Sequence, residues 1–167
     1  NIQGSDPVAA CVVFKKAKPS KQDYRKYNIK TVVGADDYAS MKEVVRRRYQ
    51  RAIEEKAALP DLLITDGGKG QMGAVKEVLD ELNLNIPIAG LAKDGKHRTS
   101  ELLYGFPPQT IGLKQNTPLF RLLTQIQDEV HRFAITFHRE KRSKRQIASE
   151  LDEIKGIEEK TKAALLK

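Results

Sequence analysis

The pattern of apolar and polar positions in the first part of the chain predicts a β-hairpin. Residues 8–14 form a short apolar run, and residues 23–33 place tyrosines, Ile29 and Val32 among basic side chains. Both stretches are typical of strands. The lysine-rich residues 15–22 between them are expected to form the hairpin loop.

An amphipathic helix is predicted next, over residues 36–56, because apolar side chains recur there every three or four positions. Asp36 or Asp37 is placed to accept hydrogen bonds from the first free backbone amides. The opposite face is basic, and it is either a solvated surface or part of a patch that contacts phosphates. The apolar stripe comprises Tyr38, Met41, Val45, Tyr49, Ala52 and Ile53, and the basic face comprises Arg46, Arg47 and Arg51.

The middle of the chain has the pattern of a strand, a helix and a second strand. Residues 62–65 are a short apolar run, helical spacing begins near Gln71, and residues 86–92 are again apolar. This order predicts two parallel strands joined by a right-handed crossover. The buried side of the helix is expected to hold Met72, Val75, Leu79 and Leu82.

The C-terminal part predicts a second hairpin and a long helix. Residues 93–117 are rich in turn formers, with a hairpin across residues 101–113. Pro118 opens a helix that is expected to end in the basic run of residues 138–146. Its apolar stripe is Leu119, Leu122, Leu123, Ile126, Val130, Phe133 and Phe137. Together the elements predict an α/β layer fold with a mixed sheet flanked by helices.

Composition narrows the class of protein. The chain has 167 residues, enough for one domain and a tail, and it begins without methionine, so we expect it to be a piece of a longer protein. Its 30 Lys and Arg exceed its 22 Asp and Glu, giving a net charge of +8 that favours a polyanionic partner such as nucleic acid. A single cysteine, Cys11, excludes an internal disulfide and fits a reducing compartment. We expect no membrane span and no signal peptide, because no apolar run approaches about 18 residues.

The first candidate for chemistry is Asp66, which stands where the strand of residues 62–65 meets the glycine-rich sequence GGKGQ. Open α/β sheets bind ligands at this kind of strand end. A nucleotide-binding phosphate loop is disfavoured, because that motif needs Ser or Thr after its lysine and Lys69 is followed by Gly70. Asp66 is therefore interpreted as a ligand for Mg²⁺ or Mn²⁺, with Lys69 holding a phosphate. The alternative is an aspartate that caps the following helix.

A second candidate is His131, at the flank of the long helix's apolar stripe. Asp128 lies one turn before it and His138 two turns after it, on the same side of the helix. Asp128 is placed to orient the imidazole and raise its basicity. The alternative is a surface histidine whose hydrogen bonds are already satisfied.

Three motifs in this order closely resemble the C-terminal half of the UvrC family, the incising subunits of bacterial nucleotide excision repair. They are DDYASMKEVVRRRY at residues 36–49, DGGKGQ at residues 66–71 and DEVHRFAITFHREKR at residues 128–142. The resemblance runs the length of the chain, since VAACVVF, YRKYNIK and the terminal IKGI also match. It implies an RNase H-like endonuclease that uses Mg²⁺ or Mn²⁺ and cuts damaged double-stranded DNA on the 5′ side of the lesion. It further implies a cytoplasmic protein that, at full length, binds a UvrB–DNA complex. No membrane and no nucleotide cofactor are expected.

The resemblance also assigns residues. It makes Asp66 a catalytic, metal-binding acid and His131 the third member of an Asp, Asp, His site, with the other aspartate upstream of Asn1. We therefore expect the chain as given to be impaired. Asp37 matches a further carboxylate of the family, although a plain helix cap is the preferred interpretation. Asp128 and Glu129 are uncertain members of the site, and the residues expected to bind nucleic acid are Lys69, Gln71, Arg139 and Arg142.

Two domains are expected. Residues 1–145 would form the RNase H-like domain, without most of its first strand, and residues 146–167 a linker and the beginning of a helix-hairpin-helix DNA-binding module. Glu158 departs from the family's hairpin, which usually has glycine there. The competing hypothesis for function is a non-catalytic, basic nucleic-acid-binding or scaffold domain, which would bind without any metal.

Overall fold

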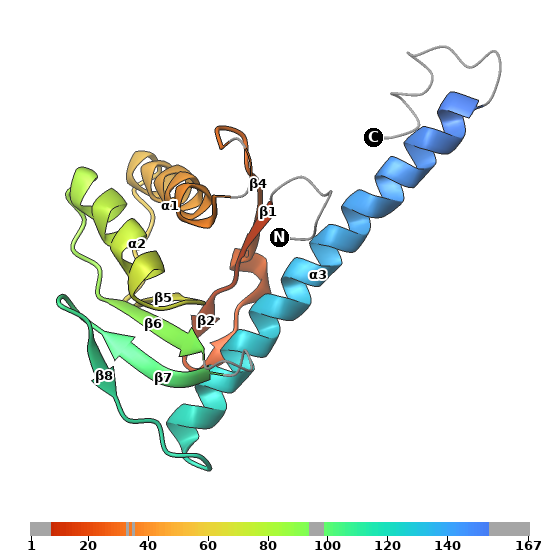
Figure 1. Cartoon of the computed structure of the whole chain (residues 1–167). Helices are drawn as coiled ribbons and strands as arrows, with labels where there is room; N and C mark the ends of the chain where they lie inside the picture. The colour runs from red at the N-terminus through yellow and green to blue at the C-terminus, as the bar shows by residue number, and fades with distance from the viewer. Residues whose placement is uncertain (1–7, 33, 35, 94–98, 154–167) are drawn as a thin grey trace.

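Two antiparallel strands begin the computed structural model, which describes residues 8–32, 34, 36–93 and 99–153 (Figure 1). Strand β1 (Val8–Cys11) pairs with β4 (Arg25–Asn28), and Val8 lies opposite Asn28. This confirms the predicted hairpin. Its loop is more ordered than expected, because it contains a smaller hairpin and a 3-10 turn: β2 (Phe14–Lys15), β3 (Lys18–Pro19) and η1 (Lys21–Asp23).

Helix α1 (Asp37–Glu54) confirms the predicted amphipathic helix. Asp36 caps it by accepting a hydrogen bond from the backbone N–H of Ala39 at 3.0 Å. The interpretation of Asp37 as the cap is therefore wrong, because Asp37 is already the first helical residue. The arginines of the outer face are ion-paired, in the pairs Arg46–Glu81, Arg47–Glu43 and Arg51–Glu55.

Glu43 of α1 is a charged side chain in the protein interior, with only 6% of its surface exposed. Its carboxylate accepts hydrogen bonds from the backbone N–H groups of Lys30 and Thr31, at 2.6 to 3.0 Å, and from the Thr31 hydroxyl. Because these amides bind Glu43, they are not available to a strand ladder. The predicted strand over residues 23–33 therefore ends at Asn28.

A four-stranded mixed sheet forms the centre of the molecule, in the order β5-β6-β7-β8. Strands β5 and β6 are parallel and joined by α2, whereas β6–β7 and β7–β8 are antiparallel. The predicted crossover and the second hairpin are both confirmed. The element bounds are β5 (Leu63–Thr65), α2 (Lys69–Glu81), β6 (Ile88–Lys93), β7 (Thr99–Tyr104) and β8 (Gln109–Ile111).

Side chains from both faces of the sheet form the core. On one face, α1 and α2 lie side by side, and the fully buried Met72, Val75 and Leu79 of α2 pack with the sheet as predicted (Figure 1). On the other face, Leu91 packs with Leu123 of the long helix. The sheet is thus covered on both sides, as expected for an α/β layer fold.

The long helix α3 (Pro118–Glu153) has 36 residues. It crosses the β-strands and then projects from the body of the molecule (Figure 1). The prediction that the helix ends in the basic run is wrong, because the helix continues to Glu153. The expected domain boundary after residue 145 falls inside this helix. The helix-hairpin-helix prediction and Glu158 lie outside the described residues. Among the described helices, none is both long and apolar enough to cross a membrane.

The hairpin β1–β4 and the sheet β5–β8 are separate sheets. Within the described part of the chain, β1 has a partner only in β4 and β5 only in β6. The outer edges of β1 and β5 are therefore unpaired by any described strand, and both α3 and α1 contact the two sheets.

We predict that Glu43→Gln lowers the free energy of unfolding at pH 7 by about 1.5 to 3 kcal/mol, the usual contribution of hydrogen bonds to a charged group. Burial raises the pKa of Glu43, but the hydrogen bonds from Thr31, Lys30 and Arg47 outweigh it and lower the pKa to about 2. The carboxylate's contribution is thus fully present above pH 4.5 and is lost as the pH falls toward 2.

Urea unfolding at a series of pH values measures this effect. The stabilities of the wild type and Glu43→Gln should converge as the pH falls below 4.5. Glu54→Gln, on an exposed position of the same helix, is the matched control and should change little. If the free energies of unfolding of wild type and Glu43→Gln differed by the same amount at all pH values, Glu43 would not be charged in the interior.

Candidate active site

Asp66 is positioned by the turn between β5 and α2. The hydroxyl of Thr65, the last residue of β5, donates a hydrogen bond to the carbonyl of Gly67 at 3.0 Å and so closes the turn. Helix α2 then begins with Gly68 as its N-cap, and no side chain binds the first amides. The alternative that Asp66 caps this helix is therefore wrong. Its carboxylate contacts α3 instead.

Three side chains from two other elements converge on Asp66. Nε2 of His131 lies 2.9 Å from Oδ2 of Asp66, across 65 positions of sequence. The amide of Gln127 donates to Oδ1 at 3.1 Å, and the ammonium of Lys93 lies 3.4 Å from Oδ2. His131 and Gln127 come from α3, whereas Lys93 ends β6. The structure thus brings the two predicted catalytic residues, Asp66 and His131, into direct contact.

The surroundings of Asp66 keep it ionised. Burial raises the pKa of its carboxyl, but the hydrogen bonds from Gln127 and His131 and the charge of Lys93 have the larger combined effect and lower it. The side chain of Asp66 is 26% exposed and that of His131 is 49% exposed. A charged carboxylate and an imidazole therefore stand together at an accessible surface.

Sequence reasoning missed Gln127 and Lys93. Gln127 could have been found from its spacing, because it lies one turn before His131 on the same face of α3. Lys93 could have been found from topology, because β6 runs parallel to β5 and the ends of parallel strands meet at one edge of a sheet.

Glu129, an uncertain member of the predicted site, anchors α3 to the hairpin. Its carboxylate accepts a hydrogen bond from the hydroxyl of Tyr24 at 3.0 Å and two from Arg132 at 2.6 and 2.9 Å. The Arg132 hydrogen bond is the main reason that the pKa of Glu129 falls to about 2, against the opposing effect of burial. Burial and the Glu129 carboxylate raise the pKa of Tyr24 to about 12. The neutral phenol and the charged carboxylate therefore form a stable donor–acceptor pair.

Aromatic and ionic contacts extend this anchor along α3. The rings of Tyr24 and Phe133 meet edge to face, with centroids 5.1 Å apart. Lys26 of β4 lies over the Phe133 ring and forms an ion pair with Glu140 at 2.9 Å. One face of α3 thus binds the hairpin, while Gln127 and His131 reach Asp66.

Comparison with known proteins matches the chain to a family. Residues 1–135 match the family model described as the UvrC RNase H endonuclease domain. The chain belongs to this family. The mixed α/β fold agrees with the RNase H-like domain that the family description names.

Three similar proteins carry the name UvrABC system protein C. Those of Bacteroides fragilis and Bacteroides thetaiotaomicron are 83% and 84% identical to the chain, and that of Streptococcus uberis is 58% identical. Each match covers 100% of this chain and 28% of the relative's own length. The chain therefore spans less than a third of the family members that it matches.

The other predicted acids, Asp128 and Asp37, have no described interaction with Asp66 or His131. Asp128 is exposed on α3, and none of the described interactions joins it to His131; the carboxylate that meets the imidazole is Asp66. Asp37 lines a surface pocket beside the first turn of α2. The side chain of His138 lies outside the described part of the structure.

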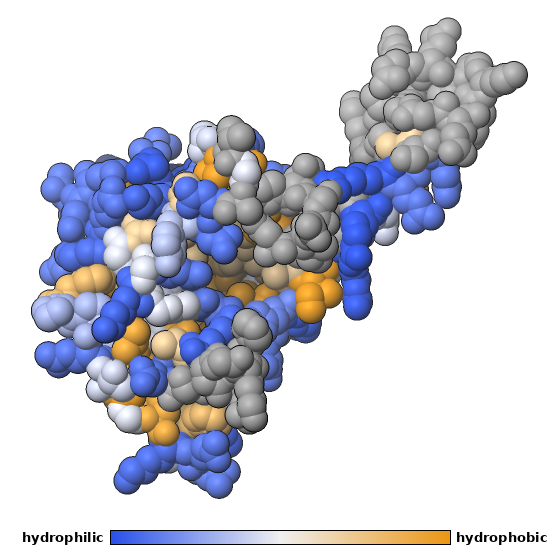
Figure 2. Space-filling model, viewed as in Figure 1, coloured by the Kyte–Doolittle hydropathy of each residue, from blue (hydrophilic) through white to orange (hydrophobic). Residues whose placement is uncertain are grey.

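The predicted DNA-binding residues fall into two places. Lys69 and Gln71 belong to the first turn of α2, where the Gln71 amide packs against Gly67: a Cβ on that glycine would lie 2.5 Å from Cδ of Gln71. Arg139 and Arg142 are exposed on the projecting part of α3. Figure 2 shows that hydrophilic residues dominate this projection.

The chemistry of the donors suits part of a divalent-metal site. Asp66 offers hard carboxylate oxygens, and His131 offers an imidazole nitrogen next to them. Across the described residues there is no cluster of three or more His, Cys, Asp or Glu that could hold a metal. Mg²⁺ is commonly held by one or two carboxylates together with water and substrate phosphate, so Asp66 is sufficient for partial coordination.

We predict that Gln127→Leu raises the pKa of Asp66, because it removes a hydrogen bond that favours the charged carboxylate. Titration of the carboxyl carbon by NMR measures the shift. Gln125→Leu, at an exposed position of the same helix, is the matched control and should leave the Asp66 pKa unchanged. An unchanged Asp66 titration in Gln127→Leu would show that the amide does not hold this carboxylate in solution.

Proposed function

We propose that this chain is a divalent-metal-dependent DNA endonuclease domain that hydrolyses a phosphodiester on the 5′ side of a lesion during nucleotide excision repair. The observation that carries the proposal is the 2.9 Å contact between Oδ2 of Asp66 and Nε2 of His131 at the end of a sheet strand. Membership of the UvrC RNase H endonuclease domain family supports it. The names of the relatives place them in the UvrABC system, which we extend to this chain.

In the proposed reaction, Asp66 and His131 have separate tasks. Asp66 remains ionised and would hold Mg²⁺ or Mn²⁺, with Gln127 and Lys93 fixing the position of its carboxylate. The bound cation supplies charge stabilisation at the scissile phosphate and lowers the pKa of a water nucleophile. Nε2 of His131 either completes the coordination or carries the proton that moves during hydrolysis.

Binding of damaged double-stranded DNA is assigned to basic and polar side chains on both sides of this site. Lys69 and Gln71 lie in the first turn of α2, close to Asp66, and Arg139 and Arg142 lie further along α3. Such groups bind phosphates without reading the base sequence. This suits a nuclease that acts wherever damage occurs, and in the full-length protein the substrate would be presented as a UvrB–DNA complex.

A second acid is proposed to come from an upstream strand. The family resemblance puts an aspartate on a strand that precedes Asn1. The separate sheets leave room for such a strand in the pairing scheme, because neither β1 nor β5 has a second partner among the described strands. A strand that paired with β5 would run beside Asp66. We therefore propose that the chain as given binds the metal weakly and has little nuclease activity.

We predict that catalysis by the full-length protein requires both Asp66 and His131. Asp66→Asn and His131→Ala should each reduce 5′ incision by about 10²- to 10⁴-fold, the usual effect of losing a proton-transfer group or its partner. Binding of DNA should be nearly unchanged, because neither residue belongs to the basic groups that contact phosphates. Incision of a labelled duplex with one lesion, together with a filter-binding titration, measures both quantities.

Asp61→Asn, an exposed acid just before β5, is the matched control for the incision assay and should cut normally. Normal incision by Asp66→Asn or His131→Ala would remove the proposed catalytic role. Loss of DNA binding and incision together would instead indicate a structural or binding role for the altered residue.

We predict that Mn²⁺ affinity depends on both Asp66 and an upstream acid. Isothermal titration with Mn²⁺ should give weaker binding for the chain as given than for a chain extended upstream by one strand, because an added carboxylate supplies a second hard ligand. In the extended chain, Asp66→Asn should weaken Mn²⁺ binding again. Equal Mn²⁺ affinities with and without the extension would show that no upstream acid completes the site.

A non-catalytic nucleic-acid-binding domain is the competing proposal. The absence of a three-ligand metal cluster from the described residues favours it, as does the exposed basic end of α3. It requires DNA binding that is independent of Mn²⁺ and normal incision by the full-length Asp66→Asn variant. The incision and titration experiments above therefore separate the two proposals.

A further inference from the structure

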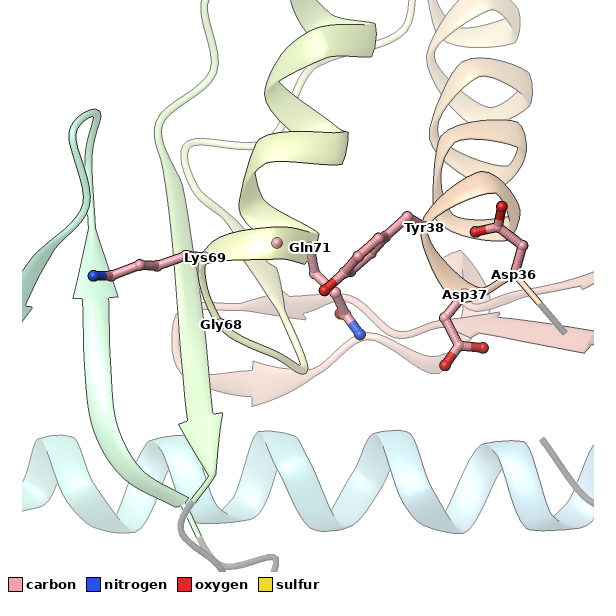
Figure 3. Close-up of a pocket in the computed structure, with 7 residues that line it drawn as sticks. Asp36, Asp37, Tyr38, Gly68, Lys69 and Gln71 are labelled. Atoms are coloured by element: carbon pink, nitrogen blue, oxygen red, sulfur yellow. The ribbon is translucent and has the colours of Figure 1, made fainter.

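An open pocket of about 680 Å³ lies between the first turns of α1 and α2 (Figure 3). Its lining includes Tyr38 of α1 and residues 68–71 of α2. Gly68 follows Asp66 by two positions, so their Cα atoms are at most about 7.6 Å apart. The pocket therefore adjoins the candidate active site, although neither Asp66 nor His131 lines it.

The pocket is lined by acidic side chains of α1 and by the first turn of α2. Asp37 contributes a carboxylate, and Oε1 of Gln71 is buried without a hydrogen-bond partner. Figure 3 shows the ammonium of Lys69 directed away from Tyr38 and Gln71. A phosphate would be repelled by the carboxylate, whereas an uncharged group would not be.

Tyr38 supplies an aromatic surface in this pocket. Its side chain remains 54% exposed although it belongs to the apolar stripe of α1. Its hydroxyl rests directly on Gly70, where a Cβ would collide with it. The glycine therefore lets the ring lie close to α2, at the wall of the pocket. An accessible tyrosine ring beside polar acceptors is a surface on which a planar heterocycle can stack.

We propose that this pocket receives an unstacked nucleobase of the DNA strand that passes Asp66, with Tyr38 stacking on the base. The inference rests on the proposed binding of DNA and adds a base-binding site to it. Stacking tolerates any base, because every base has a π-face. The energetic cost of unstacking is smallest next to damage, where bases are already poorly paired.

The test compares two short single-stranded oligonucleotides of equal length, one with normal bases and one built from abasic nucleotides. Both carry the same phosphates, so only base contacts distinguish them. Fluorescence anisotropy in EDTA measures their affinities for the chain without any contribution from metal or cleavage. The wild type should bind the normal oligonucleotide roughly 5- to 100-fold more tightly, the range expected for stacking of a base on one aromatic side chain.

Variants at the pocket identify the group responsible. Tyr38→Ala should abolish the preference for the normal oligonucleotide, while Tyr38→Phe, which keeps the ring, should retain it. Gly70→Ala should reduce the preference although Tyr38 is still present, because the new methyl group displaces the ring. Tyr104→Ala is the matched control: Tyr104 is 45% exposed and lies on β7, at the opposite end of the sheet from Lys93. It should bind like the wild type.

The outcomes separate this inference from the proposed function. If the wild type binds both oligonucleotides equally, or if Tyr38→Ala keeps the preference, the base-binding site is wrong while the endonuclease proposal stands. If the wild type binds neither oligonucleotide, the base-binding site is wrong, and the incision assay still decides the endonuclease proposal. If the preference disappears in Tyr38→Ala and Gly70→Ala but persists in Tyr38→Phe and Tyr104→Ala, the pocket binds a base.

Discussion

The contact between Asp66 and His131 depends on the docking of α3 across two separate sheets. Among the described strands, none pairs the hairpin β1–β4 with the sheet β5–β8, so helices fix them relative to each other, and α3 does so through its side chains. Glu129 and Phe133 bind the hairpin, while Leu123 packs on the sheet. Gln127 and His131 can then reach Asp66. The geometry of the site therefore depends on how α3 packs against the hairpin and the sheet.

Two carboxylates, the buried Glu43 and the half-buried Glu129, make the docked arrangement specific. A buried charge is strongly unfavourable unless several donors surround it, so each carboxylate selects one geometry of its partners. Glu43 fixes the segment after β4 against α1, and Glu129 fixes the rotation of α3 through Tyr24. Both carboxyls have pKa values near 2, so they are ionised at neutral pH. Their role is structural, in contrast to that of the more exposed Asp66.

Asp66 differs because its partners leave it accessible. Gln127, His131 and Lys93 hold a charged carboxylate at the end of a strand without enclosing it. A carboxylate in this state can exchange a protein donor for a divalent cation or a substrate. The adjoining pocket at Tyr38 places an aromatic ring beside the same turn. The proposed chemistry on a phosphate and the proposed base-binding site would thus share one glycine-rich loop.

The sequence by itself determined the order and type of the main elements, because hydrophobic periodicity records which face of each helix or strand is buried. It also singled out Asp66 and His131 through motifs. It did not reveal that Asp36, not Asp37, caps α1, that the basic run continues as helix to Glu153, or that Lys93 and Gln127 join the site. Lys93 and Gln127 meet Asp66 across 27 and 61 positions of sequence, whereas the local pattern does not distinguish two adjacent aspartates as caps. Local patterns carry information about burial, whereas only the packed tertiary structure decides which polar groups meet.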